Sequence, residues 1–191
     1  MIKELGTALR VTVISVVIFG LIYPLVLTLI AQLLFPRQAN GSLVSVNGKL
    51  VGSAIIGQLW TKPQYFHGRP SAAGKGYDPT STGGTNLGPT SKKLIDATKA
   101  TIAALEKANP DASGAPPIDL VTSSGSGIDP DISPEAAYWE APRVAKARNI
   151  SVSSVNAIVA QHVRGRTLGF LGEPRVNVLE LNLALDGTKP D

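Results

Sequence analysis

The stretch VTVISVVIFGLIYPLVLTLIAQLL, residues 11–34, decides the architecture of this chain because it runs for 24 residues without a charged side chain. At about 1.5 Å per residue, a helix of this length reaches roughly 36 Å, enough to cross a hydrocarbon core about 30 Å thick. A cleaved signal peptide has a shorter apolar region and a small-residue cleavage site, and the following FPRQANGS offers no such site. We therefore predict one uncleaved transmembrane helix.

Charges on either side of this span set its expected orientation. Lys3, Arg10 and the terminal amine precede it, whereas Arg37 and Lys49 follow it. The slight excess before the span favours a cytoplasmic N-terminus. The predicted organisation is a cytoplasmic segment at 1–10, a transmembrane helix at 11–34 and one extracytoplasmic domain at 35–191. The chain has no cysteine, so no disulfide holds that domain together.

Three residues inside the span suggest packing against another helix. Pro24 removes a backbone donor, so the helix should kink or loosen there, and the freed carbonyl needs another partner. Thr28 and Gln32 lie four residues apart and share a face. Gln32 could hydrogen-bond across helices or simply reach interfacial water, and both interpretations stay open.

The charge of the outer domain argues against a nucleic-acid partner. The domain carries 16 basic and 13 acidic residues, a net of +3. It has no basic run beyond Lys92-Lys93 and no basic stripe interleaved with aromatic residues. We expect an ordinary solvated surface.

Local patterns predict a small α+β domain with long glycine- and proline-rich loops. Asn47-Gly48 predicts a hairpin with strands at 43–46 and 49–56. Apolar periodicity predicts helices at 94–109 and 152–163, and Ser133-Pro134 should start another helix that Pro142 breaks or restarts. IDLVT at 118–122 predicts a short strand. VNVLELNLAL at 176–185 alternates like a strand but is leucine-rich like a helix, so its type stays open.

The loop FHGRPSAAGKGYDPTSTGGTNLGPT, residues 66–90, contains a Gly-Lys pair that resembles a phosphate-binding motif. A phosphate loop places four residues between its first glycine and Gly-Lys-Ser/Thr. Here five residues separate Gly68 from Gly74, and Gly76 occupies the hydroxyl position. The dinucleotide pattern fails as well, because no strand-to-helix junction surrounds the glycines. The sequence does not predict a nucleotide site here.

Other catalytic and metal-binding patterns are also missing. SSGSG at 123–127 lacks the glycine that a nucleophile elbow needs two residues before its serine. The two histidines, His67 and His162, have no metal-ligand spacing, so we expect no metal. A tethered hydrolase would have to pair Ser124 or Ser126 with one of these histidines, and a subunit without catalytic residues of its own is the better interpretation.

Eight segments in order along the chain carry a family resemblance. They are QANGSL, GSAIIGQLW, YFHGRPSA, GGTNLGPTS, ANPDAS, IDLVTSSGSGIDPDISPEAA, PRVAKARNIS and VNVLELNLALD. Together they closely resemble the C subunit of the bacterial Kdp potassium-transporting ATPase, and the similarity covers nearly the whole chain, including the single span.

The resemblance implies a subunit of a four-chain complex in the cell inner membrane. In that complex the B subunit is a P-type ATPase, the A subunit is a potassium-channel-like translocator and the F subunit is a single helix. This chain has neither an Asp-Lys-Thr-Gly-Thr stretch nor a TVGYG-like filter, so it fits neither large role. The family's C subunit is described as a catalytic chaperone that raises the ATP affinity of the B subunit and helps to hold the assembly together.

The resemblance also raises a direct ATP contact, as the alternative to an indirect role. In the family this contact is attributed to a Leu-Ser-x-x-Gln stretch, and residues 150–154 here read ISVSS. Ser154 stands where the glutamine is expected, and a hydroxyl does not offer the separate donor and acceptor of an amide. The predicted orientation would also place residues 150–154 on the side of the membrane opposite to cytoplasmic ATP.

We predict that two loops, at 66–90 and 123–134, contact the translocating subunit, because rigid loops present side chains with little ordering cost. Loops that only cap their own domain are the alternative. The candidate contact residues are Phe66, His67, Gly68, Arg69, Pro70, Ser71, Asn86, Leu87, Gly88, Ser124, Ser126 and Asp129.

Overall fold

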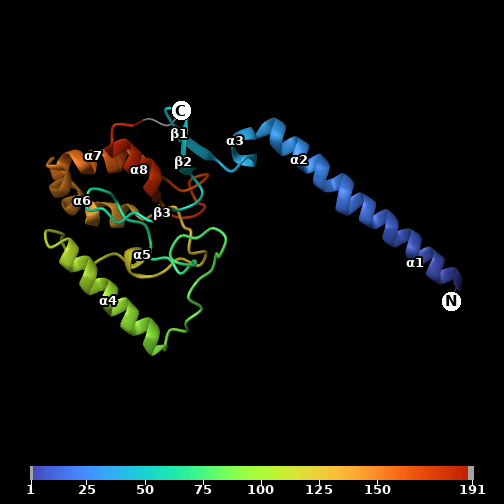
Figure 1. Cartoon of the computed structure of the whole chain (residues 1–191), viewed down its shortest axis with the longest axis horizontal. Helices are drawn as coiled ribbons and strands as arrows, with labels where there is room; N and C mark the ends of the chain where they lie inside the picture. Colours follow the sequence, from blue (N-terminus) through green and yellow to red (C-terminus); the bar gives the residue numbers. More distant parts are fainter. Residues whose placement is uncertain (1, 189–191) are drawn as a thin grey trace. The chain divides into compact units, whose positions relative to one another are not determined.

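The computed structural model of the chain describes residues 2–188 and divides it into two compact units, Met1–Leu43 and Val44–Asp191. The elements of the first unit are α1 (Ile2–Ser15), η1 (Val16–Ile22), α2 (Tyr23–Leu34) and α3 (Pro36–Ala39). Those of the second are β1 (Leu43–Val46, which begins at the boundary), β2 (Lys49–Ser53), α4 (Lys92–Ala108), α5 (Ile118–Val121), β3 (Asp131–Ile132), α6 (Pro134–Arg148), α7 (Val152–His162), β4 (Val163–Arg164), β5 (Arg175–Asn177) and α8 (Val178–Leu185). This content confirms the predicted α+β class (Figure 1).

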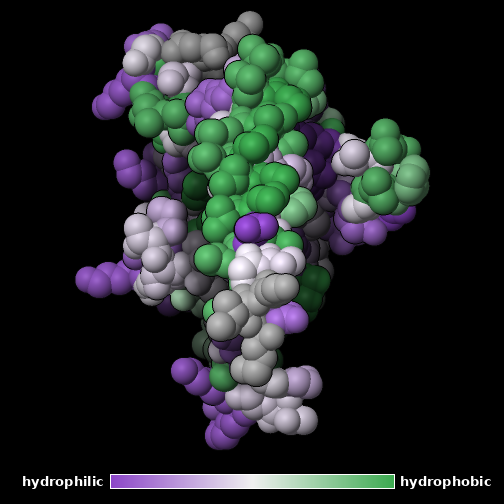
Figure 2. All heavy atoms as spheres, turned by 90° about the vertical axis from the view of Figure 1, so that its right-hand side faces the viewer, coloured by the Kyte–Doolittle hydropathy of each residue, from purple (hydrophilic) through white to green (hydrophobic). Residues whose placement is uncertain are grey.

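The first unit contains a continuous helix, Glu4–Leu34, that is long and apolar enough to cross a membrane. No residue of η1 or α2 is buried, and Figure 2 shows this helix as a nearly unbroken hydrophobic surface. The helix widens to π geometry in η1, where the Tyr23 N–H donates to Ile18 O five residues back. Pro24 follows at once at the start of α2. The predicted loosening of the helix near this proline is therefore present, as a π segment.

The end of α2 is joined to α3 by side-chain hydrogen bonds. The Gln32 and Asn40 amides bond to each other at 3.4 and 3.2 Å, and Asn40 Nδ2 also donates to Pro36 O at 2.6 Å. Gln32 is thus occupied within its own chain at the end of the span. Its predicted packing role, with those of Pro24 and Thr28, stays a prediction.

The hairpin β1–β2 confirms the prediction made from Asn47-Gly48. Both turn residues have positive φ, 51° and 72°, as a tight hairpin turn requires. The second strand ends at Ser53, earlier than expected, because the chain turns there: the Ile55 N–H donates to Ser53 Oγ at 3.3 Å.

The core of the second unit lies between a small sheet and three helices. The sheet has the order β3-β5-β4, with antiparallel pairs that place Val176 opposite Ile132 on one side and Val163 on the other. α6 packs on α7, and α7 on α8, as Figure 1 shows. The buried apolar side chains at their centre are Phe66, Leu120, Ile132, Ala136, Ala137, Trp139, Ala141, Val144, Ala145, Val155, Val159, Val176, Val178 and Leu181.

The predicted helices at 94–109 and 152–163 are confirmed as α4 and α7, and Ser133 caps α6 as expected. The strand predicted at 118–122 is wrong. This segment forms the short helix α5, which follows Pro117 and buries the adjacent residues Leu120 and Val121, whereas a strand would send them to opposite faces.

The predicted break at Pro142 is also wrong, because α6 continues through it to Arg148. Pro142 has no N–H for the carbonyl of Tyr138, but Tyr138 is exposed, so water can reach that turn. The buried Ala137, Ala141 and Ala145 pack this helix tightly, and tertiary packing outweighs the local preference.

The segment left open at 176–185 is a strand followed by a helix. β5 ends at Asn177, whose side chain accepts the Glu180 N–H at 3.1 Å and so caps α8. The alternation at the start and the leucines that follow belong to different elements.

Candidate interaction site

The loop that begins at Phe66 is anchored by Asn182 of α8. The Phe66 side chain is fully buried in the core. Its N–H donates to Asn182 Oδ1 at 2.8 Å, and Asn182 Nδ2 donates to Phe66 O at 3.0 Å. Asn182 is itself 0% exposed. One amide side chain therefore satisfies both peptide groups of a buried residue, which fixes the loop at this point.

A buried ion pair on α6 holds the residues on either side of Phe66. Glu140 accepts the His67 N–H at 2.9 Å and pairs with Arg143 at 2.7 Å. Arg143 donates in turn to Pro63 O at 2.7 Å and to Tyr65 O at 3.0 Å. Burial raises the pKa of Glu140, while Arg143 and the His67 amide oppose that rise. With every partner in place, the pair orders the loop backbone.

The end of α6 adds a third clamp through Arg148. Its guanidinium donates to Gln64 O and to Asp186, each at 2.7 Å, and lies over the Tyr65 ring, 5.1 Å from the ring centroid. The Tyr65 hydroxyl donates to Asp186 at 2.9 Å, and this hydrogen bond raises the pKa of Tyr65. Residues 63–67 are thus held by three separate groups of side chains.

The two loops predicted to make contacts lie against each other. Arg69 pairs with Asp129 at 3.1 Å, and the Ser124 N–H donates to Pro70 O at 3.3 Å. Ser71 Oγ donates to Gly127 O at 2.5 Å.

Residues further along the first loop also contact the second loop. The Gly83 N–H donates to Ser126 O at 2.8 Å, and a Cβ at Gly127 would lie only 2.7 Å from Ala73 Cβ. Because the backbones approach this closely, the two loops form one surface.

The predicted contact residues are distributed unevenly over this surface. Phe66 and Ser124 are buried, so their side chains support the loops from inside. Those that the structure brings together at or near the surface are His67, Gly68, Arg69, Pro70, Ser71, Ser126 and Asp129. Asn86, Leu87 and Gly88 lie further along, in the strand-free segment that leads to α4, where Asn86 and Gly88 are exposed and Leu87 is half-buried.

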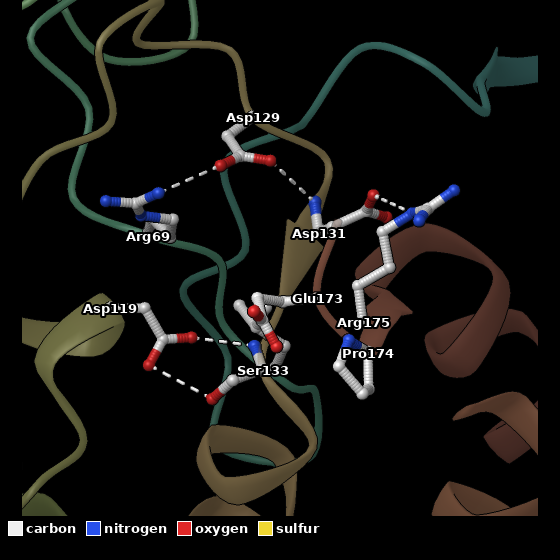
Figure 3. Close-up of a pocket in the computed structure, with 9 residues that line it drawn as sticks. Arg69, Asp119, Asp129, Asp131, Ser133, Glu173, Pro174 and Arg175 are labelled. Atoms are coloured by element: carbon white, nitrogen blue, oxygen red, sulfur yellow. Dashed lines mark hydrogen bonds and ion pairs between the residues drawn. The ribbon is translucent and has the colours of Figure 1, made fainter. Parts of the chain in front are cut away.

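A pocket of about 470 Å³ opens beside the Arg69–Asp129 pair (Figure 3). Asp131 reaches into this region and pairs with Arg175 at 3.1 Å. Burial raises the pKa of Asp131, and its hydrogen bond from Asn177 opposes the rise. On the opposite wall in Figure 3, Asp119 accepts the Ser133 N–H at 2.7 Å. Each of these carboxylates already has a partner, so the pocket is lined by polar groups that are paired with other residues of the chain.

The Gly74-Lys75 turn is closed upon itself. The Gly76 N–H donates to Ala73 O at 2.8 Å, and the Tyr77 N–H donates to Ser71 Oγ at 2.8 Å. These amides are the groups that a phosphate would need. These two amides are therefore already bonded within the chain.

Tyr77 fastens this turn to the backbone of Arg69. Its hydroxyl donates to Arg69 O at 2.6 Å, and burial raises the pKa of Tyr77 to about 12. A Cβ at Gly68 would lie 2.3 Å from that hydroxyl oxygen, so only glycine permits the approach.

The residues that order the site were not predicted from the sequence. Glu140, Arg143 and Asn182 act through contacts more than 70 residues distant along the chain. The available signal was the presence of polar residues among apolar ones, in YWEAPRVA for α6 and in VLELNLAL for α8. Such residues, when buried, need partners. Across residues 2–188 no group of three or more His, Asp or Glu side chains is arranged to hold a metal ion.

Comparison with known proteins gives a consistent match along the chain. A family model described as "K+-transporting ATPase, c chain" matches residues 5–187. A protein from Myxococcus xanthus named potassium-transporting ATPase KdpC subunit is 56% identical over 189 residues, covering 97% of this chain and 90% of the relative. Proteins of the same name from Koribacter versatilis and Bradyrhizobium diazoefficiens are each 52% identical, over 98% and 97% of this chain and 96% and 98% of the relative.

The matches include both the apolar N-terminal helix and the loops of the candidate site, because they extend from residue 5 to residue 187. The chain therefore belongs to the KdpC family, the C chain of potassium-transporting ATPases.

Proposed function

We propose that this chain is the accessory, non-transporting subunit of a high-affinity, ATP-driven potassium uptake complex. It stabilises the assembly and, as a catalytic chaperone, raises the ATP affinity of the P-type ATPase subunit. Its helix packs in the inner membrane beside the partner subunits, with the N-terminus in the cytoplasm. The outer domain rests on the translocating A subunit, in a complex that also contains the B and F subunits.

The observation that carries this proposal is the pre-ordered contact surface. The backbone of residues 63–67 is held by Asn182, by the Glu140–Arg143 pair and by Arg148. A surface that is already ordered loses little conformational entropy on binding. This economy suits a subunit whose task is to hold other chains together.

An ion-pair swap tests the contact surface. In Arg69→Asp/Asp129→Arg the two charges exchange places, so the internal pair can re-form while the charge pattern on the surface is reversed. The matched control is Lys146→Asp/Asp111→Lys, which swaps an exposed pair, 2.9 Å apart, outside the two loops. Each tagged full chain is co-expressed with the other subunits and purified in detergent.

We expect the first swap to remain folded, by tryptophan fluorescence, and to lose most of the co-purifying subunits and of the potassium uptake at low potassium. The control swap should keep both. Full co-purification and uptake with the folded Arg69/Asp129 swap would show that these loops only cap their own domain. If that swap misfolds, a chain without residues 11–34 provides the second arm: it should not restore uptake at low potassium.

The effect on ATP is tested in the purified complex. Removal of this chain should raise the KM for ATP of the remaining ATPase. A photoreactive ATP analogue should label the B subunit and not this chain.

Direct ATP contact through residues 150–154 is the alternative. Ser151 caps α7 by accepting the Ser154 N–H at 3.1 Å, and its hydroxyl also contacts Ser153 and Ser154 Oγ at 2.9 and 2.7 Å. Helix capping therefore explains these serines without a ligand. ATP-competed labelling of this chain would reverse that preference.

A further inference from the structure

The loop between β4 and β5, residues 165–174, is an ordered hairpin with an apolar tip. Thr167 and Leu171 exchange two backbone hydrogen bonds of 2.9 Å, and the Gly169 N–H donates to Arg166 O at 3.1 Å. At its base Arg166 pairs with Glu173 at 2.7 Å. These bonds give the loop a defined shape.

The tip displays large apolar side chains to solvent. Leu168 is 78% exposed, Phe170 69% and Leu171 49%. Leu168 also has a φ of 55°, a left-handed conformation that is costly for a residue with a Cβ. An ordered loop that holds a costly backbone conformation and exposes three large apolar side chains is typical of a surface that contacts an apolar environment.

A lipid surface lies within reach of this tip. Nine residues separate the end of α2 at Leu34 from Val44, where the second unit begins. Even fully extended, they span at most about 30 Å. A domain of about 150 residues has a radius of gyration of only about 15 Å, so a span in the membrane keeps the whole unit near the bilayer.

The charges around the tip suit phospholipid headgroups. The charged side chains of the loop are Arg166 and Glu173, which pair with each other, so the tip between them, residues 167–172, is uncharged. Arg164 and Arg175 flank the loop on either side, and their side chains are 49% and 41% exposed although each has an acidic partner. Apolar side chains bordered by arginines are typical of segments that lie in the interfacial layer of a membrane. There the aliphatic part of each arginine lies along apolar groups while its guanidinium reaches the phosphate layer.

We propose that the tip formed by Leu168, Phe170 and Leu171 inserts into the headgroup layer of the membrane that holds the chain's own helix. It would act as a second, shallow anchor that limits rotation of the outer domain about its linker. The proposal rests on the membrane insertion of the N-terminal helix and not on any effect on ATP.

The absence of native cysteine allows a direct test. Leu168→Cys and, as a matched control, Ala147→Cys at an exposed position of α6 are labelled with the fluorophore NBD in the full chain. Each labelled chain is reconstituted into vesicles of phosphatidylethanolamine and phosphatidylglycerol. Quenching by doxyl-labelled lipid and by aqueous iodide is then measured, in the free chain and in the assembled complex.

We expect doxyl lipid to quench the label at 168 at least about threefold more than the label at 147, and iodide to show the reverse order. Adding Phe170→Ser should reduce the lipid quenching at 168. Equal lipid quenching at the two positions would overturn the proposal. So would protection of position 168 from iodide only in the assembled complex and without lipid quenching, which would assign the tip to a protein partner.

Tryptophan emission and the urea midpoint verify that each labelled chain is folded. If the chain labelled at 168 is not, Phe170→Cys replaces it with the same expected outcomes. Because subunit co-purification is measured separately, failure of lipid insertion and failure of the proposed subunit role can be distinguished.

Discussion

Replacing Asn182 with leucine tests whether α8 holds the candidate site in place. Leucine has the same number of side-chain heavy atoms as asparagine but cannot hydrogen-bond, so Asn182→Leu leaves the buried N–H and C=O of Phe66 without their partners. An unsatisfied buried polar group costs about 1–3 kcal/mol, so the two together should cost about 2–6 kcal/mol. This is a large share of the stability of a typical domain, about 5–15 kcal/mol.

Tryptophan fluorescence during urea unfolding measures this cost in the second unit. Both tryptophans, Trp60 and Trp139, belong to that unit, and the Trp60 ring lies 4.8 Å from the ring of Tyr65 in the anchored loop. With a urea dependence of about 2 kcal/mol per molar, a loss of about 4 kcal/mol lowers the midpoint by roughly 2 M.

The control is Asn156→Leu, since Asn156 Oδ1 is buried but has no hydrogen-bond partner among the described residues. Its replacement should change the midpoint by less than about 0.5 M, because no hydrogen bond to that oxygen is lost. An Asn182→Leu midpoint within the same small range would refute the idea that this amide orders the loop.

Three further predictions address pH, backbone packing and the linker. Burial lowers the pKa of His67 from 6.5 to about 4, so between these pH values the unfolded chain binds more protons than the folded chain. The contribution of neutral His67 to folding stability is therefore present above pH 6.5 and is lost as the pH falls toward 4. After screening of a partly exposed ring, the loss should be about 1–2 kcal/mol, and urea midpoints at pH 7 and 4.5 should differ less in His67→Gln. Gly127→Ala, which meets Ala73 at a φ of 72°, should cost more than about 2 kcal/mol of unfolding free energy, whereas Gly125→Ala, with open space around it, should cost less than about 1 kcal/mol. Asn40→Ala should increase the mobility of a spin label at residue 38 by removing the bonds to Gln32 and Pro36, and unchanged mobility would show that these bonds do not order the linker.

The sequence predicted those elements whose signals are local. Asn47 and Gly48 predict a hairpin because both residue types tolerate positive φ, and both residues have positive φ in the structure. Ser133 predicts a helix start because its hydroxyl can accept the Ala136 N–H, and this bond is present at 3.0 Å. The apolar span needs no partner to be recognised, since its length and composition suffice.

The two incorrect secondary-structure predictions concern segments whose conformation depends on packing against residues far away in the sequence. Pro142 should end a helix by its own chemistry, but the close packing of α6 on α7 holds the helix through it. Residues 118–122 have β-branched, apolar character, but a turn of helix buries Leu120 and Val121 together. No short window of sequence contains the surfaces against which these segments pack.

The candidate site illustrates the same limit at the level of function. The loop residues were recognisable as a family signature, but nothing in 66–71 indicates that its order depends on a carboxylate and an amide far along the chain. Glu140 is 0% exposed, and removing only one partner of such a pair leaves a buried charge uncompensated. The loops are therefore rigid as a consequence of the core behind them. Under the contact role proposed for the loops, substitutions at the buried Glu140 or Asn182 should therefore weaken assembly, as substitutions at Arg69 and Asp129 should.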